Sequence, residues 1–294
     1  MPYFFCIITI FFFSTIELVG KLLGNSIDPL TYTSYRFFIG AIFILPFSLK
    51  YFRKEKTDLK GFLSMGWPGI IVVAVAMYLL QLSVFYGKAL TAGVIVSSNP
   101  VFVPVFSFLI LREKSGLIKI LSIFISIIGL VLIMGKKVFE ISSMDDPIKA
   151  ILFAVGASLS FALYTVLSKK YIKEYDKYRF TVISFFTGAF VLGLIGFLTG
   201  KRMLFDVEVR PLLILLYSGV FITGIAYLLY FKALEKIKAI NASMFFFLKP
   251  VFVLFFSTVL LGEKINMMEI TGVFLILISL IVSSERIFYG LKKF

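Results

Sequence analysis

Two charged side chains lie inside long apolar runs of this chain. Lys249 sits in the run FFFLKPVFVLFF, and Glu17 sits in FFFSTIELVGKLL. A charge at the centre of a bilayer costs about 2.5–3.5 kcal/mol on insertion scales, so each is expected to face protein or water. Together they could hold the two ends of a zwitterion, whereas Lys249 alone suits an anion, and Glu17 is also a candidate proton carrier. The structural alternatives are a lysine that pairs or reaches the interface, and a helical pair of Glu17 with Lys21.

Two prolines interrupt predicted helices at matching positions in the two halves of the chain. Pro250 follows Lys249, and Pro100 follows Asn99, 150 residues earlier. Proline lacks a backbone N–H and crowds the preceding turn, which frees carbonyl groups beside it. Paired interruptions of this kind indicate a binding site at the middle of the membrane, with Pro100 and Pro250 as helix-break or gating residues. A purely structural kink is the alternative.

Uncharged polar side chains within the apolar runs are further candidates. Gln81 needs hydrogen-bond partners from another helix or a ligand, and tyrosines can line a site for a small organic solute or simply pack. Arg36 is charged and stands near the start of a predicted helix, where it either attracts anions at the outer mouth or braces helix packing. The predicted substrate-binding residues are Glu17, Tyr78, Gln81, Asn99, Tyr164, Tyr227 and Lys249.

The composition shows what must position these residues. The chain is 60% hydrophobic, with a mean hydropathy of +1.02, whereas soluble domains are roughly 45–50% apolar. One aqueous core could not hide so much apolar surface, so lipid must be the solvent for most of it. A helix needs about 20 mostly apolar residues to cross a bilayer. The segments that meet this test are 3–23, 33–52, 63–86, 92–111, 117–135, 148–168, 179–199, 212–232, 240–261 and 267–285.

One block of residues occurs twice. PVFVPVFSFLILREK begins at Pro100 and PVFVLFFSTVLLGEK begins at Pro250, and nine of the fifteen positions are identical. Internal self-similarity on this scale predicts two copies of one unit, the first over residues 1–140 and the second over 141–294, with five helices each. The Glu-Lys pairs that end the blocks, at 113–114 and 263–264, are expected to be solvated helix caps.

Basic residues predict the orientation of the chain. Nineteen of the 30 Lys and Arg residues fall on the same side as both termini and ten on the other. Because cytoplasmic loops carry the excess of basic residues, both termini are expected to be cytoplasmic. Five helices per unit is an odd number, so the second unit must enter the membrane from the opposite side. We therefore predict an all-α integral protein of the plasma or inner membrane, with ten transmembrane helices forming two inverted five-helix repeats around a central cavity.

Several segments resemble the EamA domain of the drug/metabolite transporter superfamily. They are the repeated PVF stretch with its LREK or LGEK end, DPLTYTSYRF at 28–37 and ALYTVLS at 162–168. The resemblance covers nearly the whole chain. It implies an inner-membrane carrier, often an exporter of amino acids or other small metabolites, whose helices 1, 3, 4, 6, 8 and 9 surround a cavity. One position departs from the family, since the residue before the second proline is often acidic or small and here is Lys249.

Missing residue types argue against other chemistries. The chain has no histidine and one cysteine, Cys6, so no metal, no cofactor and no Cys/His catalysis is predicted. Its basic residues fall in short clusters between apolar runs, which is typical of membrane loops and not of a nucleic-acid surface. We expect no enzyme, but a secondary carrier that moves a small polar, amino-acid-like metabolite by alternating access, in the export direction. The alternatives are an anionic or aromatic metabolite or drug as solute and, in a different class, an intramembrane enzyme or channel. The expected partners are the solute, the bilayer and, as a candidate coupling ion, the proton; the oligomeric state is not indicated.

Overall fold

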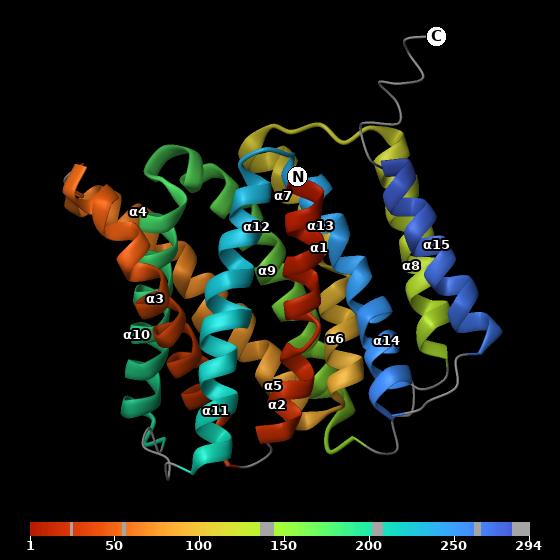
Figure 1. The fold of residues 1–294 in the computed structure, drawn as a ribbon, viewed down its shortest axis with the longest axis horizontal. Helices are drawn as coiled ribbons and strands as arrows, with labels where there is room; N and C mark the ends of the chain where they lie inside the picture. The colour runs from red at the N-terminus through yellow and green to blue at the C-terminus, as the bar shows by residue number, and fades with distance from the viewer. Residues whose placement is uncertain (24–25, 55–56, 136–143, 202–207, 262–265, 284–294) are drawn as a thin grey trace.

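The fold is known from a computed structural model, which describes residues 1–23, 26–54, 57–135, 144–201, 208–261 and 266–283. Throughout these residues the secondary structure is helical, and they contain no β-strand. Figure 1 shows the helices side by side in one bundle. In chain order they are α1 (Pro2–Phe13), α2 (Ile16–Leu23), α3 (Pro29–Lys54), α4 (Leu59–Gly69), the π-helical η1 (Ile70–Met77), α5 (Tyr78–Tyr86), α6 (Ala89–Ser97), the 3-10 turn η2 (Asn99–Val101), α7 (Val103–Phe106), the π-helical η3 (Ser107–Leu111), α8 (Leu117–Met134), α9 (Pro147–Tyr175), α10 (Lys177–Leu198), α11 (Val209–Tyr217), the π-helical η6 (Ser218–Ile225), α12 (Ala226–Leu234), α13 (Ala239–Met244), the 3-10 turn η7 (Phe245–Leu248), α14 (Lys249–Leu261) and α15 (Met267–Ser283).

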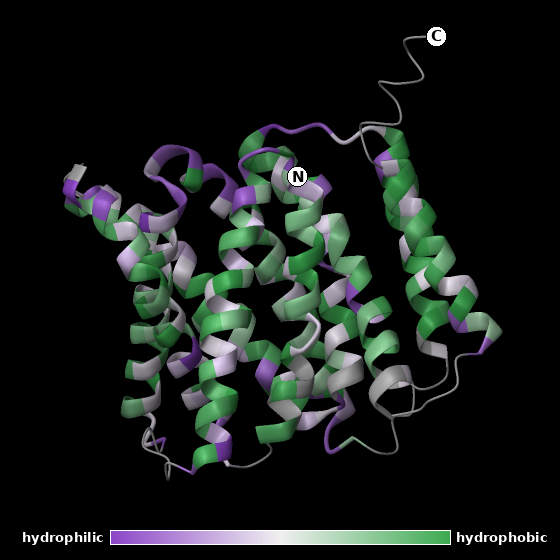
Figure 2. Ribbon diagram, viewed as in Figure 1, coloured by the Kyte–Doolittle hydropathy of each residue, from purple (hydrophilic) through white to green (hydrophobic). Residues whose placement is uncertain are grey.

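The bundle has the surface of a multi-pass membrane protein. Seven helical stretches among the described residues are long and apolar enough to cross a bilayer, and three shorter apolar helices, α1, α8 and α15, coincide with the other predicted spans. Figure 2 shows hydrophilic residues at the two ends of the bundle and a hydrophobic belt between them. Large apolar side chains such as Phe190 and Phe197 of α10 are exposed. Contact with water would be unfavourable for these side chains, whereas contact with lipid would not.

Aspartate side chains fix where several helices begin. The Asp58 carboxylate accepts a hydrogen bond from the Gly61 N–H at 2.8 Å, and Asp146 accepts one from the Lys149 N–H at 3.1 Å. Each bond satisfies one of the backbone donors that a helix start leaves without an intrahelical partner. Asp176 has a φ of 72° between α9 and α10 and caps α10, so the two long helices reverse direction within one residue.

Three of the apolar spans are interrupted within the membrane. The first predicted span breaks after Phe13, where Ser14 and Thr15 form a turn and their hydroxyls donate to the Ile10 and Phe12 carbonyls. The apolar run 3–23 predicts a continuous helix there, and the break corrects that prediction. The other two interruptions are the 3-10 turns η2, which contains Pro100, and η7, which directly precedes Lys249 and Pro250. Interrupted helices expose backbone groups that a solute can use.

Equivalent positions of the two halves make equivalent contacts. A Cβ on Gly69 would overlap the Ser184 carbonyl, and a Cβ on Gly219 would meet Ile39 and lie 3.3 Å from the Arg36 carbonyl oxygen. Gly219 lies 150 residues after Gly69, and Ser184 lies 148 residues after Arg36. Between these contacts the rings of Phe37 and Phe185, and of Phe38 and Phe186, meet edge to face at centroid distances of 4.8 and 5.2 Å. Only glycine allows the backbones this close, so α4 packs tightly on α10 and η6 on α3, while the paired rings join α3 to α10.

Candidate functional site

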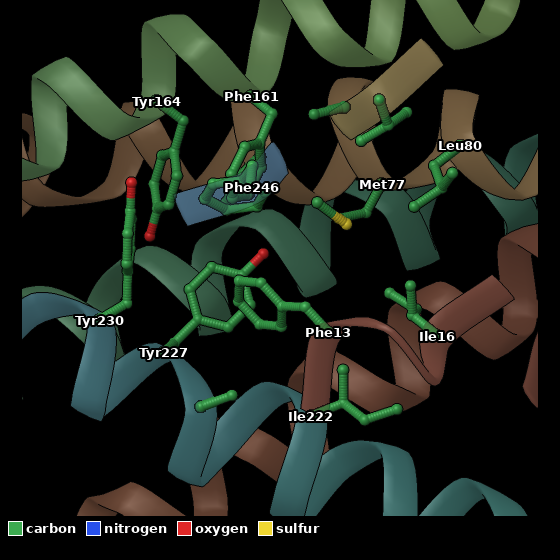
Figure 3. Close-up of a cluster of buried hydrophobic side chains, with 14 of the residues drawn as sticks. Phe13, Ile16, Met77, Leu80, Phe161, Tyr164, Ile222, Tyr227, Tyr230 and Phe246 are labelled. Atoms are coloured by element: carbon green, nitrogen blue, oxygen red, sulfur yellow. The ribbon is translucent and has the colours of Figure 1, made fainter. Parts of the chain in front are cut away.

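A narrow cavity lies between the interrupted helices. Its interior volume is about 20 Å³, which is room for about one water molecule. Its walls come from the first, third, fourth, sixth, eighth and ninth predicted spans, which are the six that the family resemblance implies. The lining residues are Phe13, Ile16, Met77, Leu80, Val96, Phe161, Tyr227, Phe246 and Lys249. Figure 3 shows Phe13, Phe161, Tyr227 and Phe246 converging on this space from four different elements.

Lys249 brings the charge to this cavity. Its side chain is 3% exposed, and it is the first residue of α14, directly after the 3-10 turn η7. Among the described lining residues every other side chain is apolar or aromatic. A buried ammonium in a low-dielectric wall is a strong recognition group for an anion because little water competes with it. The Glu17 side chain, its predicted counterpart, lies outside the described residues, which include only its place in α2.

The aromatic wall centres on Tyr227. Its ring centroid lies 5.0 Å from that of Phe13 and 6.4 Å from that of Tyr164, and all three residues are buried. The hydroxyl oxygen of Tyr227 has no hydrogen-bond partner among the described residues, whereas the Tyr164 hydroxyl lies near those of Ser168 and Ser184. In a buried aromatic cluster such hydroxyls normally find a partner. Tyr227 can therefore offer one polar group within an otherwise flat apolar surface.

The remaining predicted side chains have different surroundings. Gln81 is buried beside the lining residue Leu80, and its Nε2 has no partner among the described residues. Asn99 is fully buried, and its Nδ2 donates to the Val96 carbonyl at 3.0 Å, so it stabilises the turn η2 locally. Tyr78 is half-buried and absent from the cavity wall. Pro100 and Pro250 are buried at the helix interruptions.

Arg36 does not lie at an exposed mouth. It is 0% exposed and begins the third turn of α3, where its guanidinium stacks over two rings. Its Cζ lies 4.8 Å from the Phe37 ring centroid and 5.5 Å from that of Tyr32. Helix α3 therefore holds a second buried cation close to the aromatic wall.

A buried polar cluster at one end of the bundle went unrecognised in the sequence. The Glu113 carboxylate accepts hydrogen bonds from Ser107 Oγ at 2.8 Å and from the Ala239 N–H at 3.2 Å, and it lies 3.5 Å from Lys169 Nζ. Lys169 is 5% exposed and also donates to the Leu234 carbonyl at 3.1 Å. Glu113 was expected to be a solvated cap, and that expectation is wrong because three other elements surround its carboxylate. Glu263, its repeat equivalent, lies outside the described residues.

An exposed ion pair lies at the opposite end of the bundle. Lys201 Nζ lies 3.2 Å from Asp28 Oδ2, and it joins the end of α10 to the connection before α3. The hydrogen bond to this carboxylate raises the pKa of Lys201 above its ordinary value of 10.5. Lys201 is thus charged at neutral pH, and on the alkaline side its contribution is lost as the pH rises through that raised value. Exposed ion pairs contribute little stability, so we expect this contact to add little to the stability of the fold.

Comparison with known proteins identifies relatives over the full length of the chain. Residues 1–135 and 148–284 match the model of the EamA-like transporter family. A protein of Clostridium kluyveri described as an uncharacterized transporter is 36% identical over 99% of this chain and 96% of its own length. The uncharacterized transporter YoaV of Bacillus subtilis is 29% identical over 86% of each chain. A crystal structure with 14% sequence identity has the same fold, with a TM-score of 0.76 over 96% of both chains.

Proposed function

The chain belongs to the EamA-like transporter family, and we propose that it is a secondary carrier that moves a small polar metabolite across the plasma or inner membrane by alternating access. The observation that carries this proposal is Lys249, a charge 3% exposed in the wall of a cavity at the meeting point of interrupted helices. A family of transporters and a buried recognition group at mid-bundle together favour a carrier over an intramembrane enzyme.

We further propose that the carrier consists of two inverted five-helix repeats. The matched contacts of Gly69 with Ser184 and of Gly219 with the backbone of Arg36 support this arrangement. Two halves related by a two-fold axis in the membrane plane must place equivalent contacts on opposite sides of that axis. The paired rings of Phe37 and Phe185 then lie on the axis itself. Such symmetry gives the carrier two states that the same two-fold rotation relates, one open to each side of the membrane.

The cluster at Glu113 and Lys169 supports a state that is closed at one end. It joins the end of the fourth predicted span to the sixth span and to the start of α13. Figure 1 places α7 and α13 at the end of the bundle where the chain begins. Opening at that end requires the Glu113–Lys169 pair to separate. Both groups would then reach water, which offsets part of the lost ion pair and makes the two states close in free energy.

The preferred solute is amino-acid-like, and export is the expected direction. Lys249 would bind the carboxylate end, and Glu17, from its place in α2, is proposed to bind the ammonium end or to carry a proton. A second candidate is an anionic or aromatic metabolite. The lining by Phe13, Phe161 and Tyr227 favours it, because stacked or edge-to-face rings accept a flat apolar solute body.

The test is counterflow in proteoliposomes. Solutes that raise the melting temperature of the purified protein are first selected from amino acids, organic acids and amines, then loaded inside the vesicles. A carrier exchanges external labelled solute for internal solute with saturable kinetics. We expect Lys249→Met to abolish exchange while the protein remains folded in the membrane, and Lys236→Met, at an exposed lysine, to exchange normally. Flux that rises linearly with concentration and shows no exchange would point to a channel and overturn the proposal.

A further inference from the structure

Arg36 is the one fully buried side chain among the described residues whose permanent charge has no hydrogen-bond acceptor. Its Nε, Nη1 and Nη2 atoms all lack a partner among the described residues, although the side chain is 0% exposed. The Tyr32 and Phe37 rings beneath the guanidinium provide a cation–π contact over its face. Ring faces leave the in-plane N–H donors unsatisfied, since these point outward at the edge of the group. The N–H groups at the edge of the guanidinium can therefore bind an acceptor that the described residues do not supply.

The surroundings of Arg36 offer more donors and no described carboxylate partner. Gly40 lies one turn after Arg36 on the same face of α3, and a Cβ there would come 2.7 Å from Thr223 Cγ2. Tyr227 lies one turn after Thr223, and its ring centroid is 5.9 Å from that of Phe37. Helix α3 therefore packs against η6 and α12 through the Gly40–Thr223 and Phe37–Tyr227 contacts, and we call this line of contact the seam. The hydroxyl oxygens of Thr223 and Tyr227 also lack partners among the described residues.

Tyr227 belongs both to this seam and to the cavity wall. Its ring meets Phe37 on one side and lines the cavity with Phe13 and Lys249 on the other. Arg36 and Thr223 are not among the lining residues, so a solute in the cavity would reach the guanidinium edge past the Tyr227 ring. The cavity walls are aromatic or aliphatic apart from Lys249, which suits a body that is small and apolar.

We propose that Arg36, with the Thr223 and Tyr227 hydroxyls, forms a seat for a carboxylate, and that the transported solute carries this group on a small apolar body. This inference rests on the carrier function proposed above and names the substrate class of that carrier, with Arg36 in place of Lys249 as the partner of the carboxylate. A carboxylate has two coplanar oxygens that match the two parallel N–H groups of a guanidinium edge. Its remaining lone pairs can accept from hydroxyls, and its single negative charge neutralises Arg36. An ammonium or an uncharged amide would leave the guanidinium without a counter-charge.

The proposal predicts an unusual stability pattern. A buried charge without an acceptor destabilises the empty protein, so Arg36→Met should have an apparent Tm equal to or above that of the wild type. If Arg36 served only to brace helices through Tyr32 and Phe37, the same substitution would lower the Tm. The sign of this shift separates the two roles without any ligand.

The ligand test compares a carboxylate with its neutral amide. We would measure the apparent Tm of purified protein with 3-phenylpropionate, acetate and the corresponding amides, at pH 7 and constant ionic strength. Saturating carboxylate should raise the wild-type Tm by about 2–4 °C, and the amide should not. Arg36→Met should lose this shift, and Arg36→Lys, which keeps charge but not the paired N–H groups, should need about tenfold more carboxylate. Arg210→Met, at an exposed arginine of α11, should behave as the wild type.

The inference is overturned if neither carboxylate stabilises the wild type more than its amide, if folded Arg36→Met has a lowered Tm, or if Arg36→Met keeps the full carboxylate shift. Should Arg36→Met fail to fold, Arg36→Lys alone decides, because an unchanged carboxylate affinity in that variant contradicts the seat. Counterflow that proceeds at the wild-type rate in Arg36→Met would remove the seat and leave the carrier intact. Absence of saturable exchange in the wild type would instead remove the carrier, while the binding assay would still report on Arg36.

Discussion

Lys249 and Arg36 show how differently two buried cations can be supported. Lys249 lies at a helix interruption, where freed carbonyls and a cavity surround it, and the cost of its burial is reduced by the irregular backbone. Arg36 lies within the regular part of α3, where the backbone groups are already used by the helix and, among the described contacts, two ring faces approach its guanidinium. We therefore propose that the first cation is a recognition group at an irregular point of the fold, and that the second binds an acceptor from the solute.

Glu17 is the proposed residue for energy coupling. If it carries the coupled proton, Glu17→Gln should abolish the response of transport to an imposed proton gradient while leaving solute exchange at equal pH intact. Glutamine keeps the shape and the hydrogen-bonding oxygen but cannot take up a proton. The measurement is uptake into proteoliposomes with and without a pH gradient. Full gradient-driven uptake by the variant would show that Glu17 does not couple transport.

The helices meet through glycine at points where no side chain fits. We expect Gly69→Ala to lower the stability by about 1–3 kcal/mol, because the added methyl would overlap the Ser184 carbonyl and push α10 away. Gly116→Ala is the matched control, since a Cβ there meets nothing within 4 Å. Thermal unfolding in detergent compares the two variants. Equal stability of both would contradict the close packing of α10 on the end of α4.

The Glu113–Lys169 cluster is expected to act as a latch between helices. Glu113→Gln keeps an oxygen for Ser107 and Ala239 but leaves Lys169 buried without its counter-charge, a loss of about 3 kcal/mol for a buried pair. The closed state should therefore be less populated. Asp28→Asn breaks the exposed pair with Lys201 and should have little effect.

The latch can be measured by the access of reagents to the cavity. A single cysteine at Val96, a lining residue, in a Cys6→Ala background should react faster with a membrane-impermeant maleimide in Glu113→Gln than in the parent. The faster reaction is expected only from the face where Glu113 lies. Unchanged labelling from both faces would mean that the cluster is structural and not a latch.

Much of the architecture could be predicted because it depends on local or repeated sequence. The apolar spans follow from hydropathy. The duplicated PVF block predicts that Pro100 and Pro250 are equivalent, and the structure has a 3-10 turn at or just before each of them. The break after Phe13 was missed because a single Ser-Thr pair is tolerated in most helices, and only the packing around Phe13 and Ile16 selects the turn. Its weak signal was the presence of two adjacent hydroxyl side chains that can bond to their own backbone.

The parts of the site that were not predicted depend on contacts between distant segments. Glu113 resembles any charged residue at a helix end, and its burial arises only when the start of α13 and Lys169 of α9 close over it. Arg36 lies close enough to a helix start to reach the surface, but α10, η6 and α12 cover that face of α3. Contacts between segments that are far apart in the chain leave no periodic pattern of residues in a single sequence.

At the scale of the whole molecule, the proposed carrier function depends on two repeats that would pass through the membrane in opposite directions. Lys88 and Lys238 are repeat equivalents, each directly before a helix, α6 and α13 respectively. Figure 1 shows those helices beginning at opposite ends of the bundle. An inverted pair gives each solute-facing residue a counterpart with opposite access, which is what allows one cavity to open alternately to both sides.

The most direct test places a single cysteine at either lysine in the Cys6→Ala background and labels intact cells with a membrane-impermeant maleimide. Lys88→Cys should react in intact cells, whereas Lys238→Cys should react only after the membrane is made permeable. Labelling of both cysteines from the same side would mean that the two copies enter the membrane in the same direction, and the alternating-access account would fail.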